Sequence, residues 1–172
     1  MSRCQVGLFK KMKSSHFSPD ILEFMYLLHE FGVRYLIVGG EAVIYYGHAR
    51  LTGDVDFFYE REEANAGNMY KAIHAFWDGA IPGDITVNDL MQAGVIIQFG
   101  QPPNRIDIIN TITGVTFGEA WAGRRTEKLS MKRKHFSVYI LGLEHLRKNK
   151  KVTGRYKDLE DLRYLNRIGG TH

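Results

Sequence analysis

Cysteine is almost absent from this sequence. Cys4 is the only one, so no intramolecular disulfide can form and no cysteine-based zinc cage can be built. This usage favours a reducing compartment. Proline is also scarce, with four in 172 residues, and the 44% apolar, 24% charged composition is that of an ordinary globular protein. We therefore expect one domain that spans residues 1–172.

Long apolar runs are missing as well. No stretch approaches the ~18 residues needed to span a bilayer. The basic residues Lys10, Lys11 and Lys13 are followed by no apolar segment of signal-peptide length. We expect a soluble, cytoplasmic protein with no membrane partner. The seven histidines include no pair at metal-ligand spacing on one helix, which argues against a zinc site.

Charge is distributed unevenly along the chain. Residues 1–123 carry 9 Lys/Arg and 14 Asp/Glu, whereas residues 124–172 carry 14 and 5. A basic C-terminal third can attract nucleic acid, but it can equally balance a polyanionic ligand such as a triphosphate. Arg124-Arg125 and Lys132–Lys134, expected in loops or short strands, are the candidates for contact with RNA.

Apolar periodicity predicts helices that alternate with strands. Ser18-Pro19 forms an N-cap followed by proline at the first helical position, which marks the start of a helix. The first predicted helix ends before Gly32, and the others cover about 41–46, 66–77, 143–151 and 156–168. The predicted strands cover 35–38, 54–59, 95–99, 105–109 and 137–141. The pattern predicts an α/β (α+β) protein with a small mixed sheet flanked by helices, with a core over 18–141 and a C-terminal helical segment over 142–168.

Two aspartates alternate with apolar residues in one predicted strand. Asp54 and Asp56 should leave the same face of the strand, with Cα atoms roughly 6.6 Å apart, while Val55 enters the core. Asp107 repeats the arrangement on another strand and can supply a third metal ligand or a general base. Three carboxylates at this spacing suit Mg²⁺, or Mn²⁺, in phosphoryl transfer.

A Gly39-Gly40 pair stands where a strand hands over to a helix. Without side chains, the backbone N–H groups of such a turn can meet phosphate. Each feature also has a simpler explanation, because acid-apolar alternation is common on exposed edge strands and Gly-Gly is common in turns.

The combination of these features is more specific than each alone. The chain contains Val38-Gly39-Gly40, then a gap of thirteen residues, then Asp54-Val-Asp-Phe57, and an isolated Asp107 on a later predicted strand. This arrangement resembles the nucleotidyltransferase superfamily related to DNA polymerase beta. The resemblance covers about residues 33–110. It implies a nucleotidyltransferase fold in which Asp54, Asp56 and Asp107 hold metal and Gly39-Gly40 binds nucleotide.

The segment 154–162, Gly-Arg-Tyr-Lys-Asp-Leu-Glu-Asp-Leu, strengthens the resemblance. It is similar to the segment that closes many minimal members, including abortive-infection-type toxin components and some aminoglycoside and lincosamide nucleotidyltransferases. Lys157 would stand in the first turn of a helix, where the macrodipole disfavours a cation. We therefore expect Lys157 to bind the triphosphate; the alternative is an i, i+4 pair with Asp161.

The expected function is metal-dependent transfer of a nucleoside monophosphate from a nucleoside triphosphate to an acceptor hydroxyl. The acceptor, whether a small molecule, tRNA or a protein side chain, is left open. One alternative is a catalytically silent nucleotide- or partner-binding module of the same fold, such as a toxin–antitoxin component. The other is a basic nucleic-acid-binding protein, whose affinity would fall steeply with salt and would not need magnesium.

Overall fold

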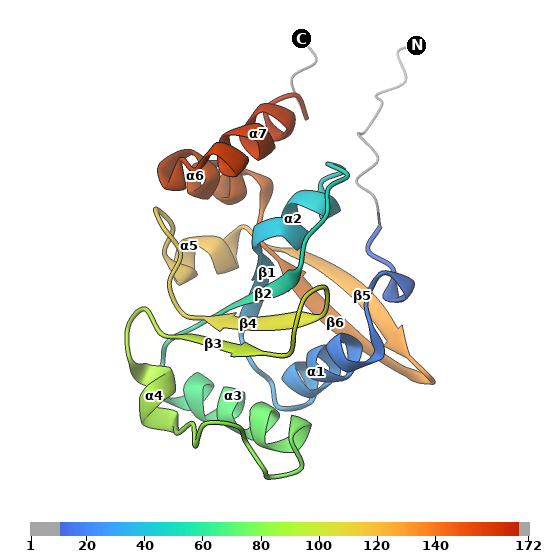
Figure 1. The fold of residues 1–172 in the computed structure, drawn as a ribbon, viewed down its shortest axis with the longest axis vertical. Helices are drawn as coiled ribbons and strands as arrows, with labels where there is room; N and C mark the ends of the chain where they lie inside the picture. Colours follow the sequence, from blue (N-terminus) through green and yellow to red (C-terminus); the bar gives the residue numbers. More distant parts are fainter. Residues whose placement is uncertain (1–10, 169–172) are drawn as a thin grey trace.

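A six-stranded mixed sheet runs through the molecule, with helices on both sides (Figure 1). The computed structural model describes residues 11–168. The strands are β1 (Tyr35–Val38), β2 (Asp54–Tyr59), β3 (Ile96–Phe99), β4 (Arg105–Ile109), β5 (Arg125–Met131) and β6 (Lys134–Ile140). The helices are η1 (Ser14–His16), α1 (Pro19–Glu30), α2 (Gly39–Tyr45), α3 (Glu63–Phe76), α4 (Val87–Met91), α5 (Phe117–Ala122), α6 (Leu143–Thr153) and α7 (Tyr156–Leu165). The predicted class, a mixed sheet flanked by helices, is confirmed.

The sheet order is β3-β4-β2-β1-β6-β5, so β2 lies between β4 and β1. It runs parallel to β4 and antiparallel to β1. The predicted antiparallel pairing of β3 with β4 is confirmed. β1 is buried along its whole length, as expected of four consecutive apolar residues at the centre of a sheet covered on both faces.

Consecutive residues of β2 pack against opposite layers of helices. The Phe57 ring meets Phe24 of α1 at 5.3 Å between centroids, whereas the Phe58 ring meets Phe117 of α5 at 5.2 Å. In Figure 1, α1, α3 and α4 lie below the sheet, and α2, α6 and α7 lie above it. Because side chains alternate along a strand, Asp54 and Asp56 share the face of Phe58. The acidic face of β2 therefore looks toward the layer that contains α2.

The predicted start of the first helix is confirmed. The Ser18 Oγ accepts a hydrogen bond from the Ile21 backbone N–H at 3.4 Å, and Pro19 occupies the first helical position. The buried face of α1 consists of Ile21, Phe24, Met25 and Leu28. This 3.6-residue periodicity explains why the helix could be located from sequence.

Four elements were not predicted: η1, α4, α5 and β5. Several boundaries also differ. α2 begins at Gly39 rather than after a separate glycine turn, and α7 ends at Leu165 although the apolar spacing continues to Ile168. α3 and β6 each begin three residues earlier than predicted, at Glu63 and Lys134. Within residues 11–168, no helix has the length and apolar character required to cross a bilayer.

Candidate active site

Three aspartates converge on the face of the sheet that α2 covers. Asp56 on β2 stands directly beside Asp107 on the parallel strand β4, and Asp54 lies two residues before Asp56. One carboxylate oxygen from each residue lies within 4.8 Å of the other two. The prediction that all three share one face of adjacent strands is confirmed. Three carboxylates at this spacing form a set of oxygen ligands suited to a hard divalent cation.

Burial and two acidic neighbours strongly perturb the carboxyl group of Asp56. Burial raises its pKa to about 7, and the negative charges of Asp54 and Asp107 add to that rise. The positive charges of Lys150 and Arg105 oppose the shift. Near neutral pH the cluster therefore holds more negative charge than its surroundings readily stabilise, and a cation would relieve this imbalance.

Arg105 contributes a cation to the cluster that the sequence did not indicate. It lies two residues before Asp107 on β4, so both side chains leave the same face. Its Nε and Nη2 donate to the two carboxylate oxygens of Asp107 at 2.7 and 3.0 Å, and Nη2 also donates to Asp54 Oδ2 at 2.7 Å. Gln98 on β3 donates a further hydrogen bond to Asp107, at 3.0 Å.

The two glycines allow α2 to approach the acidic strand. Gly39 has φ +61°, and a Cβ placed there would lie 2.0 Å from Asp56 Oδ2. A Cβ on Gly40 would lie 2.6 Å from the Thr52 hydroxyl oxygen. The same hydroxyl donates to the Asp54 carboxylate at 3.0 Å. Gly39-Gly40 therefore lies directly against the predicted metal ligands, as a phosphate-binding element would need to.

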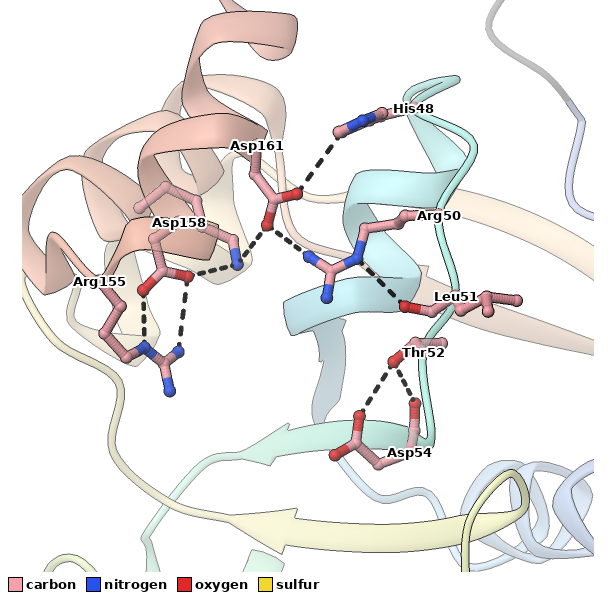
Figure 2. Close-up of polar contacts among 9 residues, drawn as sticks. His48, Arg50, Leu51, Thr52, Asp54, Arg155, Asp158 and Asp161 are labelled. Atoms are coloured by element: carbon pink, nitrogen blue, oxygen red, sulfur yellow. Dashed lines mark hydrogen bonds and ion pairs between the residues drawn. The ribbon is translucent and has the colours of Figure 1, made fainter.

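A second charged cluster joins the C-terminal helices to the loop between α2 and β2 (Figure 2). Lys150 of α6 is buried between Asp158 and Asp161 of α7, at 2.8 and 3.0 Å. Arg50 of the loop reaches Asp161 at 2.5 Å, and Arg155 reaches Asp158 at 2.7 Å. Burial alone would raise the pKa of Asp158, but the hydrogen bonds from Arg155 and Lys150 outweigh it and hold this pKa below its ordinary value.

The loop carrying Arg50 also leads directly to the acidic cluster. In Figure 2 it runs from His48 through Arg50 and Thr52 to Asp54. The ion pair between Arg50 and Asp161 thus ties the C-terminal helices to the segment that precedes the first metal-ligand candidate. This contact explains how residues 111 positions apart help to shape one site.

Lys157 lies in a pocket of about 370 Å³ between α7 and this loop. The pocket is also lined by His48, Arg50 and Tyr164, and the last stacks on His48 with ring centroids 4.5 Å apart. Within residues 11–168, no ion pair joins Lys157 to Asp161, whose carboxylate pairs with Arg50 and Lys150 instead. The alternative i, i+4 pair is therefore not formed, while the triphosphate role of Lys157 stays a prediction.

A pocket of about 340 Å³ lies on the other side of α2. Glu41, the residue after Gly40, is buried there and contacts the His16 ring nitrogen at 2.8 Å. Burial raises the pKa of Glu41, His16 lowers it, and the charge of Asp54 raises it. No sequence pattern singles out Glu41.

Two further basic segments had been considered for RNA. Arg124 stacks over the Trp121 ring, 4.0 Å from its centroid, and Lys134 lies over Tyr26 at 4.2 Å. Lys132 and Arg133 form the turn of the β5–β6 hairpin. These contacts give Arg124 and Lys134 intramolecular packing roles, and contact of this segment with RNA stays a prediction.

Comparison of the chain with protein-family models and with curated proteins finds no match. The functional argument therefore rests on the geometry of the site.

Proposed function

We propose that this chain is a metal-dependent nucleotidyltransferase of the fold typified by DNA polymerase beta, which moves a nucleoside monophosphate from a nucleoside triphosphate to an acceptor hydroxyl. The observation that carries the proposal is the convergence of Asp54, Asp56 and Asp107 on adjacent strands, with Gly39 in contact with the middle carboxylate. A solvent-facing edge strand would explain the alternation of acids, but it would not explain a third acid in register or a glycine fitted against them.

The residues present fit a divalent metal. Three carboxylates within 4.8 Å offer the oxygen donors that Mg²⁺ and Mn²⁺ prefer. We assign Asp54, Asp56 and Asp107 as the ligands. Bound there, the metal would stabilise negative charge on the phosphate oxygens.

The chain's other residues would bind and orient the triphosphate. The missing side chains of Gly39 and Gly40 leave room for Asp56 and Thr52, and the backbone N–H groups at the start of α2 would bind the phosphate oxygens. Lys157 and Arg50 line the pocket beyond the loop and supply positive charge. Holding donor and acceptor in line accounts for much of the rate in this type of reaction.

The reaction requires one bond to form and one to break. The acceptor oxygen bonds to the α-phosphorus, the bond from that phosphorus to the bridging oxygen breaks, and pyrophosphate leaves with the electron pair. The proton of the acceptor hydroxyl passes to a carboxylate or to water. The sequence pattern favours Asp107 as that carboxylate, and this role stays a prediction.

The acceptor is a small molecule, an RNA end or a protein hydroxyl, and a direct experiment separates them. We would incubate the protein with α-labelled triphosphates, Mg²⁺ and a cell extract, and determine which fraction becomes labelled. We expect label in one acceptor class, and none with Asp54→Asn or Asp107→Asn. The matched control is Asp20→Asn, which removes an exposed acid from the first turn of α1 and should retain transfer. Equal labelling by all four proteins would refute the role of the acidic cluster.

A further inference from the structure

Arg105 competes for the oxygen atoms that the proposed metal requires. Its guanidinium donates to both carboxylate oxygens of Asp107 and to one of Asp54. A guanidinium that donates two N–H groups to one carboxylate makes the strongest kind of hydrogen bonding between these two side chains. The remaining oxygen of Asp54 accepts from Thr52. A cation that binds Asp54 and Asp107 must therefore replace hydrogen bonds that Arg105 now makes.

The surroundings of Arg105 allow it to move. Its side chain is 28% exposed, and among residues 11–168 the guanidinium is held only by the carboxylates of Asp54 and Asp107. Lys150 provides the contrast, because its side chain is 6% exposed and it is fixed between two acids of α7. Of these two cations, which both influence Asp56, Arg105 alone has a route to solvent.

We propose that Arg105 is a displaceable counter-cation of the acidic cluster. Its guanidinium keeps the carboxylates of Asp54 and Asp107 together against their mutual repulsion, and it yields them to a divalent cation. The released guanidinium keeps its positive charge, and an anionic triphosphate that arrives with the metal would give it a new partner. Arg105 thereby disfavours metal without triphosphate. The inference rests on the proposed metal site.

The test is direct binding of Mn²⁺ alone, followed by electron paramagnetic resonance at one fixed pH of about 8, above the ordinary pKa range of carboxyl groups. Arg105→Gln should bind Mn²⁺ about tenfold more tightly than wild type, because it loses both the competing hydrogen bonds and the repulsion between two cations. Arg105→Lys, which keeps the charge but lacks the fork, should fall between them. Mn²⁺ should also raise the melting temperature of Arg105→Gln more than that of wild type.

The matched control is Arg61→Gln. Arg61 is exposed beyond the other end of β2, and within residues 11–168 its side chain donates a hydrogen bond only to the Met91 carbonyl, so the variant removes the same charge far from the cluster. Its Mn²⁺ affinity should stay within about twofold of wild type. Equal or weaker Mn²⁺ binding by folded Arg105→Gln would overturn the inference, and if that variant does not fold, equal or weaker binding by Arg105→Lys would do so. Absence of Mn²⁺ binding in every protein would overturn it too.

The outcome separates this inference from the proposed function. Tighter Mn²⁺ binding by Arg105→Gln, with no nucleotide transfer by wild type, would support Arg105 as a counter-cation and refute the nucleotidyltransferase. Transfer by wild type with unchanged Mn²⁺ binding in Arg105→Gln would support the enzyme and refute the role of Arg105.

Discussion

The two charged clusters of this protein differ in how their charges balance. In the C-terminal cluster, buried Asp158 contacts Lys150 and Arg155, and buried Asp161 contacts Lys150 and Arg50. In the acidic cluster on the sheet, Arg105 pairs with Asp54 and Asp107, and among the described residues Asp56 has no ion pair. The pKa values differ in the same direction, since that of Asp158 is lowered and that of Asp56 is raised to about 7.

On the proposed function, this difference separates acids with a structural role from acids that bind a ligand. Buried acids that are fully paired connect helices, and removing one leaves its cations without a partner. Acids gathered in excess of cations destabilise the metal-free protein and persist when a ligand provides the missing positive charge. The predictions below follow from this contrast and are ordered by expected effect.

The largest effect is expected for Asp56→Asn. Loss of a metal ligand should reduce nucleotide transfer by on the order of 10³-fold. The free energy of unfolding of the metal-free protein should stay the same or rise, because the substitution relieves repulsion from Asp54 and Asp107. Activity assays and urea denaturation measure the two quantities. A variant that is both active and less stable would place Asp56 among the structural acids.

Asp161→Asn should behave in the opposite way. It leaves Arg50 and buried Lys150 short of one partner, and breaking such a buried pair costs about 3–5 kcal/mol of stability. Urea denaturation checks this. The control is Glu160→Gln, an exposed neighbour on the same helix, which should change stability by less than about 0.5 kcal/mol. Equal stability of the two variants would mean that the C-terminal cluster does not connect the helices.

Gly39→Ala tests the close approach of α2 to Asp56. The new methyl group would overlap the Asp56 carboxylate, and the backbone has a positive φ, so we expect a loss of about 1–3 kcal/mol in the free energy of unfolding. Gly67→Ala in α3, where no atom lies within 4 Å of the added carbon, should instead stabilise by about 0.4–1 kcal/mol. If both substitutions changed the free energy of unfolding in the same direction, the close approach of Gly39 to Asp56 would be refuted.

Lys157→Ala tests whether a lysine at the edge of the C-terminal cluster binds triphosphate or stabilises the fold. Because Lys157 is exposed and forms no ion pair with Asp161, stability should hardly change. Triphosphate affinity should fall about tenfold, which corresponds to ~1.4 kcal/mol for a charged hydrogen bond. Calorimetric titration measures it. Unchanged affinity would remove Lys157 from the nucleotide site.

The smallest effect concerns pH. A carboxyl whose pKa is higher in the folded state binds protons more readily there than in the unfolded chain, so stability falls as pH rises from about 4 to about 7. For Asp56 we expect on the order of 1 kcal/mol of stability to be lost in the metal-free protein, because solvent reduces the full linkage value. Asp56→Asn should lack this contribution. Identical pH profiles for wild type and variant would contradict the raised pKa.

Local patterns explain what could be predicted. The 3.6-residue spacing located α1, and two-residue alternation placed Asp54 and Asp56 on one face of β2. The short helices α4 and α5 carry capping boxes, Thr86 with Asp89 and Thr116 with Glu119, so a search for that signal would have found both. β5 was missed because its half-exposed residues show no clear apolar alternation.

The remainder of the site depends on contacts between distant segments. Arg50 meets Asp161 across 111 residues, and Arg105 meets Asp54 across 51. No local periodicity marks such residues, and Lys150 looked like one of several lysines at the end of a helix. Only the tertiary fold shows that Lys150 is buried between two acids, whereas Lys157, which the sequence favoured, lies exposed on a pocket wall.

The most direct test of the central claim compares α- and γ-labelled forms of the same nucleoside triphosphate. The protein is incubated with each form, Mg²⁺ and the acceptor fraction, and the label that enters the acceptor is measured. Transfer of a nucleoside monophosphate predicts that the α label enters the acceptor, only with Mg²⁺, while the γ label leaves as pyrophosphate. Entry of the γ label, or entry of neither by folded protein with all four nucleotides and a complete extract, would contradict the account.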